Sequence, residues 1–268
     1  MTVSRQDYAY LQALLRRTTA NTLDDDKHYL VEARLTPVAH AHDHPDVSAL
    51  LRAARLGQLH LHDPIVEAMT INETSFFRDA YPFRALEQHI LPELLARHAR
   101  PLRMWSAAAS TGQEAYSLAL LMADSFGGKP TPSILGTDVS GAALERAKAG
   151  VYSQMEVNRG LPARLLLRHF TQDGRRWQIR PEIQRTARFI QMNLCQPWPA
   201  MPSMDVILLR NVLIYFDEQT RSSVIERVVA ALNPGGYLFV GNAETLMVRS
   251  VGVERVEFDR SMCFRARD

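Results

Sequence analysis

The sequence lacks the features that mark secreted, disulfide-bonded or membrane-spanning chains. Only two cysteines occur, Cys195 and Cys263, and they form neither a metal-binding spacing nor a disulfide framework. The first residues contain no apolar core of the kind found in signal peptides, and no run of about 18 apolar residues occurs anywhere. We therefore expect a cytoplasmic protein that inserts no segment into a membrane.

A strong charge of one sign is also missing. The 268 residues carry a formal net charge of +2, which is too close to neutral to predict nucleic-acid binding by the chain as a whole. Apolar residues make up 46% and charged residues 22%, as in ordinary globular proteins. A chain of this length can form either one large domain or a large domain with a smaller companion, and either arrangement buries a real core.

The sequence has few metal-binding patterns. Six of the nine histidines fall within the first 70 residues, where His40, His42 and His44 alternate and His60 and His62 follow. No pair of histidines has the His-x-x-x-His spacing on a clear helix face, so a solvated loop is favoured over a zinc site. We expect no metal.

Apolar spacing predicts three consecutive parts of the chain. Tyr8, Leu11 and Leu14 recur at helical spacing, as expected for one face of an amphipathic helix. The predicted parts are an all-helical domain over residues 1–70, a linker and connecting helix over 71–100, and an α/β domain over 101–268.

The most informative stretch runs from Trp105 to Leu120. An apolar segment, residues 102–104, predicts a buried strand before it, and a helix-period pattern begins at Gln113. Small residues and Gly112 lie between strand and helix. This order brings a ligand close to backbone N–H groups at a helix N-terminus, although an ordinary strand–helix turn would have the same pattern.

A second strand, predicted over residues 132–137, ends at Asp138. This aspartate follows Gly112 by 26 positions, where an acidic side chain usually binds the hydroxyls of a nucleoside ribose. The alternative is a simple helix cap. Because no G-x-G-x-x-G fingerprint is present, the pattern favours S-adenosylmethionine over NAD as the cofactor.

The remaining pattern predicts a class I S-adenosylmethionine methyltransferase fold, an α/β doubly wound sheet preceded by the helical domain. Five parallel strands and a final antiparallel pair are expected, with ligands at the strand carboxyl ends. A small antiparallel β insertion is expected at about 151–187. The later strands and the closing hairpin are expected at 188–192, 204–209, 237–241 and 253–265.

The insertion coincides with the one strong charge asymmetry in the sequence. From Glu156 to Arg188 there are eight arginines and three acidic residues. A docking face for an acidic partner and a solvated surface with arginine stems on apolar patches both explain this composition.

Five motifs in this order resemble the chemotaxis receptor methyltransferases, the CheR family. They are N-E-T-S-F-F-R-D from residue 72, W-S-A-A-A-S-T-G-Q-E-A-Y from 105, I-L-G-T-D-V-S from 134, R-N-V-L-I-Y-F-D from 210 and P-G-G-Y-L-F-V-G-N-A-E-T-L from 234. The resemblance covers about residue 70 to the end, and residues 1–70 match only in length and helical pattern. It implies methyl transfer from S-adenosylmethionine to glutamates of receptor cytoplasmic domains, leaving S-adenosylhomocysteine. We also expect the protein to be a monomer.

The resemblance also assigns roles to particular residues. Arg78 and Tyr215 would lie at the reacting methyl group and are the expected catalytic residues. Glu114 would meet the methionyl end of the cofactor, Asp138 the ribose, and Asn193 the adenine. The full set of expected cofactor-binding residues is Asn72, Thr74, Arg78, Ala107, Gly112, Glu114, Asp138, Asn193, Leu194, Arg210 and Asn211.

Simpler structural roles remain open for several of these residues. Thr111 and Glu114 fit a capping box, so Glu114 could only close its helix. Thr74 or Ser75 could cap a helix that begins beside Arg78. Asn193 could only form a turn.

The predicted chemistry needs no general base, because a glutamate with a pKa near 4.3 is already ionised at pH 7. This agrees with the lack of a His/Asp or Cys/His pair in the motifs. A methyltransferase acting on another protein or on a small carboxylic acid is the alternative. A nucleic-acid amino-methyltransferase would carry [DN]-P-P-[YFW] where Arg210-Asn211 stands. The short predicted turn at 171–175 argues against binding of a receptor tail.

Overall fold

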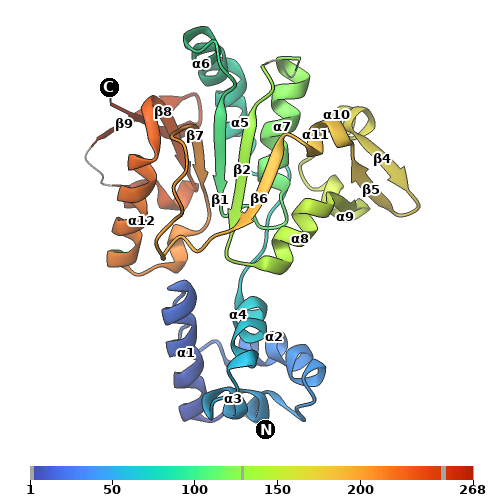
Figure 1. Ribbon diagram of the computed structural model, residues 1–268, viewed down its shortest axis with the longest axis vertical. Coiled ribbons are helices and arrows are strands. Elements are labelled where there is room, and N and C mark those ends of the chain that lie inside the picture. Colours follow the sequence, from blue (N-terminus) through green and yellow to red (C-terminus); the bar gives the residue numbers. More distant parts are fainter. Residues whose placement is uncertain (1–2, 128–129, 249–251, 268) are drawn as a thin grey trace. The chain divides into compact units, whose positions relative to one another are not determined.

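The computed structural model describes residues 3–127, 130–248 and 252–267. The chain folds into two compact units. One unit comprises Met1–Ile71 and Tyr215–Thr220, and the other comprises Asn72–Ile214 and Arg221–Asp268. Figure 1 labels most of the helices and strands of both. The first unit is therefore discontinuous in the sequence.

The first unit is helical. Its helices are α1 (Arg5–Thr19), α2 (His28–Ala41), α3 (Val47–Arg55), the short 3-10 helix η1 (Leu59–Leu61) and α4 (His62–Met69). The Ser4 side chain accepts the Asp7 N–H at the start of α1, and Asp46 accepts the Ala49 N–H at the start of α3. Apolar side chains from all four α-helices form the core of this unit.

Residues 215–220 join the first unit by backbone pairing. Asn21 and Phe216 form an isolated antiparallel bridge, and the Thr22 N–H donates to the Tyr215 carbonyl at 3.2 Å. Residues 215–220 are thus paired with the chain that follows α1, although they are far from it in the sequence.

The second unit is built on a seven-stranded sheet with the order β6-β2-β1-β7-β8-β10-β9. Its strands are β1 (Arg103–Ala107), β2 (Ser133–Asp138), β6 (Ala187–Gln191), β7 (Met204–Leu209), β8 (Leu232–Val240), β9 (Val253–Phe258) and β10 (Ser261–Ala266). The five strands from β6 to β8 are parallel, and β10 is antiparallel to both its neighbours. The predicted doubly wound sheet with a closing hairpin is confirmed.

Helices connect these strands. α7 (Gln113–Ser125) follows β1, α8 (Gly141–Ala149) follows β2, and α12 (Glu218–Ala230) precedes β8. The connecting helix expected within residues 71–100 forms as three segments, α5 (Tyr81–Ala85), the π-helical η2 (Leu86–Ile90) and α6 (Leu91–Arg97). Pro92 lacks the N–H that a regular helix would use there, which explains the break. No helix in the described ranges is long and apolar enough to cross a bilayer.

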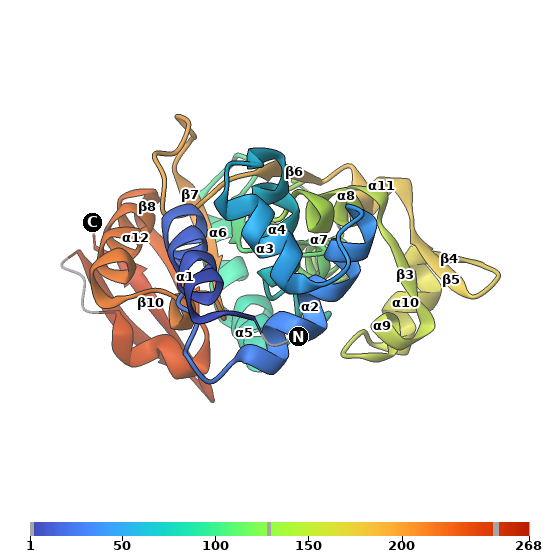
Figure 2. The ribbon, with the colours of Figure 1, turned by 90° about the horizontal axis from the view of Figure 1, so that it is seen from below.

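The predicted antiparallel insertion is confirmed as a three-stranded sheet, β3-β5-β4. Its elements are β3 (Val151–Ser153), α9 (Gln154–Asn158), α10 (Ala163–His169), β4 (Phe170–Asp173), β5 (Arg176–Ile179) and α11 (Pro181–Gln184). Asp173 pairs with Arg176, so the β4–β5 turn contains only Gly174 and Arg175. This lobe lies at the β6 end of the main sheet, on the opposite side from β9 (Figures 1 and 2).

A buried carboxylate ties together the amino ends of three core strands. Asp205 accepts both terminal nitrogens of Arg100 at 2.7 and 2.8 Å, the Arg103 N–H at 2.8 Å and the Asn233 side-chain amide at 2.8 Å. Burial raises the pKa of Asp205, but these donors outweigh it and the net shift is downward. The group lies at the edge opposite the strand carboxyl ends, so its role is structural.

Candidate active site

The loop after β1 has the conformation expected of a ligand-binding loop. Gly112 has φ +93°, and a side chain there would place a Cβ 2.8 Å from that of Ala147. Ser110 also has a positive φ, of 50°. The Tyr152 hydroxyl donates to the Thr111 carbonyl at 2.9 Å and supports the loop from below. A tight backbone of this kind requires glycine at position 112. Ala107, at the end of β1, is buried.

Asp138, at the end of β2, holds two loop backbones. Its Oδ2 accepts the Ser110 N–H at 2.8 Å, and its Oδ1 accepts the Ser140 N–H at 2.9 Å. Helix α8 is capped by Ser140 instead, whose hydroxyl accepts the Ala143 N–H at 3.0 Å. The alternative role of Asp138 as a helix cap is therefore wrong. A carboxylate accepts up to about four hydrogen bonds, which suits contact with ribose hydroxyls.

Glu114, at the start of α7, faces the strand ends and does not cap its helix. Gly112 is the N-cap of α7 and makes no side-chain cap bond, so the capping-box alternative is wrong. The Glu114 carboxylate accepts the Ser106 hydroxyl at 2.8 Å and the Arg210 Nη1 at 3.0 Å. The helix N-terminus also favours a negative charge at this position.

Arg210, after β7, is almost completely buried, with 1% of its side chain exposed. Its Nη2 donates to Asp79 Oδ2 at 2.5 Å and to the Arg78 carbonyl at 3.0 Å. With the Glu114 bond, the guanidinium thus joins α7 to the segment that carries Arg78. Within the described part of the chain, the buried Nε has no hydrogen-bond partner. Sequence reasoning missed Asp79, although it directly follows Arg78 in a motif.

Residues 72–80 form an irregular segment beside these strand ends. The Asn72 carbonyl accepts the Ser110 hydroxyl at 2.7 Å, and its side-chain amide donates to Ser140 at 3.4 Å, so Asn72 lies close to Asp138. Thr74 is half-buried. The Arg78 guanidinium donates to the Glu73 carbonyl at 3.0 Å.

The same segment is strained. Phe77, Asp79 and Ala80 have φ values of 47°, 66° and 49°, which side-chain-bearing residues rarely adopt. The helix α5 starts only at Tyr81, with Ala80 as its N-cap and no side-chain cap bond. The alternative in which Thr74 or Ser75 caps a helix is therefore wrong. Strained backbone of this kind concentrates at functional sites.

A second buried carboxylate, which the sequence did not single out, organises the loop after β7. Glu244 in η4 (Asn242–Met247) is fully buried and accepts the N–H groups of Asn211 at 2.8 Å, Gly241 at 2.7 Å and Ile214 at 3.3 Å. Asn211 has φ 59°, so this carboxylate fixes a strained turn. The only sequence signal is an acidic residue in the motif after β8.

Asn193 and Leu194 follow β6. The Met192 N–H donates to the Asp138 carbonyl at 2.9 Å, which places these residues next to the end of β2. The Asn193 side chain accepts the Cys195 N–H at 2.9 Å, as in the turn that the sequence left open. Leu194 is buried.

The structure thus brings most of the expected cofactor-binding residues to the carboxyl ends of neighbouring parallel strands. Asn72 and the β1 loop surround Asp138, while Glu114 and Arg210 are paired directly. Tyr215 belongs to the first unit. Its position at the reacting methyl group stays a prediction.

Buried carboxylates after β1 and at the end of β2, on a mostly parallel sheet, are typical of enzymes that bind a nucleoside cofactor at the strand carboxyl ends. Residues 72–261 match the family model "CheR methyltransferase, SAM binding domain". The chain is 35% identical over 275 residues to Chemotaxis protein methyltransferase 1 of Pseudomonas aeruginosa, covering 100% of both chains. It is 38% identical over 252 residues to the chemotaxis protein methyltransferase of Vibrio anguillarum, covering 92% of this chain and 91% of the relative. The chain belongs to the CheR methyltransferase family.

A solved TehB-like SAM-dependent methyltransferase from Corynebacterium glutamicum is 16% identical, with a TM-score of 0.40 over 70% of this chain and 94% of that chain. The family match confirms the expected enzyme class and the expected cofactor, S-adenosylmethionine.

Proposed function

We propose that this enzyme transfers the methyl group of S-adenosylmethionine to glutamate side chains of chemoreceptor cytoplasmic domains, acting in the cytoplasm as a monomer. The products are glutamyl methyl esters and S-adenosylhomocysteine. The observation that carries this proposal is the match to chemotaxis methyltransferases over their whole length. Two of the family motifs also meet in the structure. Arg210, in the loop after β7, donates to the Arg78 carbonyl of the 72–80 segment.

The residues at the strand ends fit this cofactor. The Asp138 carboxylate would accept the ribose hydroxyls, and Glu114 would attract the ammonium group of the methionyl end. Asn72 and Thr74 would close over the cofactor, and Leu194 would contact the adenine. When bound, the cofactor supplies an activated methyl group on a sulfonium centre. The protein then has to bind the cofactor, orient the acceptor carboxylate and exclude water.

The acceptor carboxylate is ionised at neutral pH and needs no proton removed. Catalysis is therefore mainly positioning of a carboxylate oxygen in line with the methyl carbon. The planar, permanently charged guanidinium of Arg78 suits the orientation of a carboxylate. Tyr215 would place its ring and hydroxyl near the sulfonium.

We also propose that the enzyme needs no receptor C-terminal tail. The β4–β5 turn contains only Gly174 and Arg175, which leaves a short hairpin in the inserted lobe. A tail-truncated receptor should be methylated as well as the intact one. Micromolar binding of a free tail peptide, measured by calorimetry, would contradict this part of the proposal.

The function is tested by incubating the enzyme with labelled S-adenosylmethionine and receptor cytoplasmic domains. Label that enters the receptor and is released by base as methanol identifies a carboxyl methyl ester. The alternative, a methyltransferase for another protein or a small carboxylic acid, predicts no label in any receptor fragment and methylation without a receptor.

A further inference from the structure

A cavity of about 450 Å³ lies within the second unit, between the 75–80 segment, α5, η2, α7 and α10. Its floor is apolar and is formed by Phe77, Phe83, Leu121 and Leu165. Volumes of this size are typical of sites that take a ligand or an anchoring side chain. Neither the cofactor-binding residues at Asp138 nor those after β6 line it.

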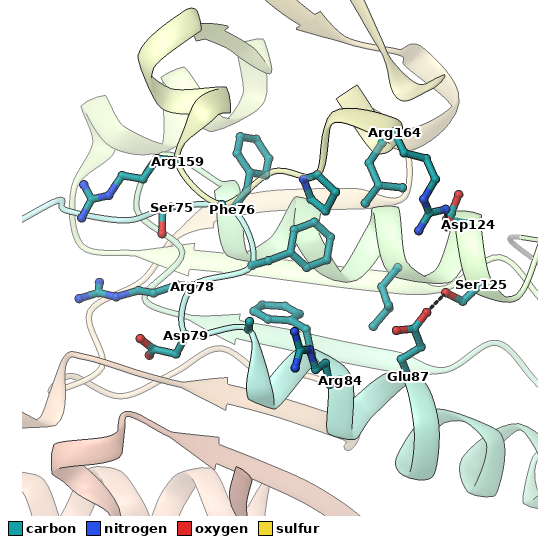
Figure 3. A pocket seen from close by; sticks show the side chains of 17 residues that line it. Ser75, Phe76, Arg78, Asp79, Arg84, Glu87, Asp124, Ser125, Arg159 and Arg164 are labelled. Atoms are coloured by element: carbon teal, nitrogen blue, oxygen red, sulfur yellow. Dashed lines mark hydrogen bonds and ion pairs between the residues drawn. The ribbon is translucent and has the colours of Figure 1, made fainter. Parts of the chain in front are cut away.

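Charged side chains surround the apolar floor. Figure 3 shows Arg78, Asp79 and Arg159 on one side and Arg164, Asp124, Ser125 and Glu87 on the other. The carboxylates among them are already engaged. Asp79 binds Arg210, Asp124 binds Arg164 and Arg168, and Glu87 accepts the Ser125 hydroxyl.

Positive charge on this rim is only partly neutralised. Arg159 pairs with Glu73, and Arg164 shares the carboxylate of Asp124 with Arg168, which does not itself line the cavity. Among the described residues, Arg78 and Arg84 make no ion pair: Arg78 donates to a backbone carbonyl, and Arg84 lies over the Tyr81 ring at 5.6 Å. The rim therefore has guanidinium groups available for the carboxylates of a partner.

We propose that this cavity binds the stretch of the substrate protein that flanks the reacting glutamate. The occupant is an acidic segment that places one apolar side chain on the Phe77–Leu165 floor and a second carboxylate near Arg84. This inference rests on the proposed function, in which the acceptor is a protein glutamate. It extends that function from the reacting atoms to substrate recognition.

Continuity with the predicted reaction centre supports this occupant. Arg78, the expected orienting residue for the acceptor carboxylate, lines the cavity itself. Asp79, its neighbour, also lines the cavity while bound to Arg210, which is paired with Glu114. A chain seated on the floor thus leaves the cavity beside Arg78, where its glutamate would react.

The test uses the full-length enzyme, a receptor cytoplasmic fragment and labelled S-adenosylmethionine in steady-state assays. Arg84→Glu reverses a rim charge, and Ser125→Trp fills the cavity from its edge. Each should raise KM for the fragment about five- to tenfold, the scale of losing one or two exposed charge contacts or an anchor site. kcat and the affinity for S-adenosylhomocysteine, measured by calorimetry, should stay within about twofold of wild type.

Arg255→Glu is the matched control, because it makes the same charge change on the exposed surface of β9, away from the cavity. It should leave KM unchanged. An equal rise in KM with Arg255→Glu would reduce the effect to overall charge and overturn the inference. Unchanged KM in Arg84→Glu would also overturn it, whether or not Ser125→Trp folds. If wild-type enzyme methylates no receptor fragment, the proposed function itself fails.

Discussion

The buried guanidinium of Arg210 is shared by two carboxylates, and this sharing predicts a strong coupling between them. Arg210 is 1% exposed, while the Glu114 and Asp79 side chains are 10% and 37% exposed. Asp79→Asn or Glu114→Gln keeps the shape and removes one negative charge. Each single change should cost about 1 kcal/mol of unfolding free energy, the difference between a charge-assisted and a neutral hydrogen bond.

The double variant leaves the guanidinium buried without any carboxylate. Breaking a buried ion pair in this way costs about 3–5 kcal/mol, so the two changes should be coupled by about 1–3 kcal/mol. Urea unfolding followed by tryptophan fluorescence measures all four corners of the cycle. Additive costs, within about 0.5 kcal/mol, would refute the idea that one charge holds both carboxylates. Asp79→Asn should also lower turnover, since Asp79 anchors the strained segment that carries Arg78, and Asp79→Glu should restore part of it.

Three further substitutions test the candidate active site and the buried Asp205 cluster of the core sheet. Asp138→Ala should weaken S-adenosylhomocysteine binding by about 1–3 kcal/mol in calorimetry, and unchanged affinity would exclude the ribose contact. Arg78→Ala should lower single-turnover methylation about 10²–10³-fold at saturating cofactor, with little rescue by lysine; near-normal turnover would make Arg78 only a binding residue. Asp205→Asn should lower the free energy of unfolding by about 2 kcal/mol near neutral pH. This figure is kept modest because solvent screens the partly exposed Arg100 partner. The pKa of Asp205 is lower in the folded protein than in the unfolded chain. Its contribution to the free energy of unfolding is therefore present above its unfolded-state pKa and is lost as pH falls through its folded-state pKa. The stabilities of wild type and Asp205→Asn should converge in acid.

The parts of the fold that repeat a local period could be predicted from the sequence. The buried strands, the loop at Gly112 and the acidic residue at Asp138 follow from apolar runs, a glycine and spacing. The helix between Tyr81 and Arg97 shows the limit, because an apolar pattern with prolines at positions 82 and 92 does not reveal a π-helical break. The strand order and register could be predicted only through the fold class that the motifs suggested, because no local pattern indicates which strands pair.

The long-range polar contacts could not be predicted. Glu244 accepts the N–H groups of Ile214 and Asn211, which are 30 and 33 residues away in the sequence. No local pattern indicates which backbone a buried carboxylate will meet. Arg210 was expected at the cofactor, but the structure engages its terminal nitrogens with Asp79, Glu114 and the Arg78 carbonyl. Local sequence identifies that a buried arginine needs partners, and only the three-dimensional structure identifies them.

The pairing of Asn21 with Phe216 bears on how this protein can be divided or recombined. A shortened chain that begins at Asn72 would retain residues 215–220 but lose the backbone groups at Asn21 and Thr22 that pair with them. A hybrid that exchanges only the N-terminal helices with a relative would face the same mismatch. In both cases, residues 215–220 have to be redesigned together with the helices, since the two belong to one compact unit and pair through their backbones.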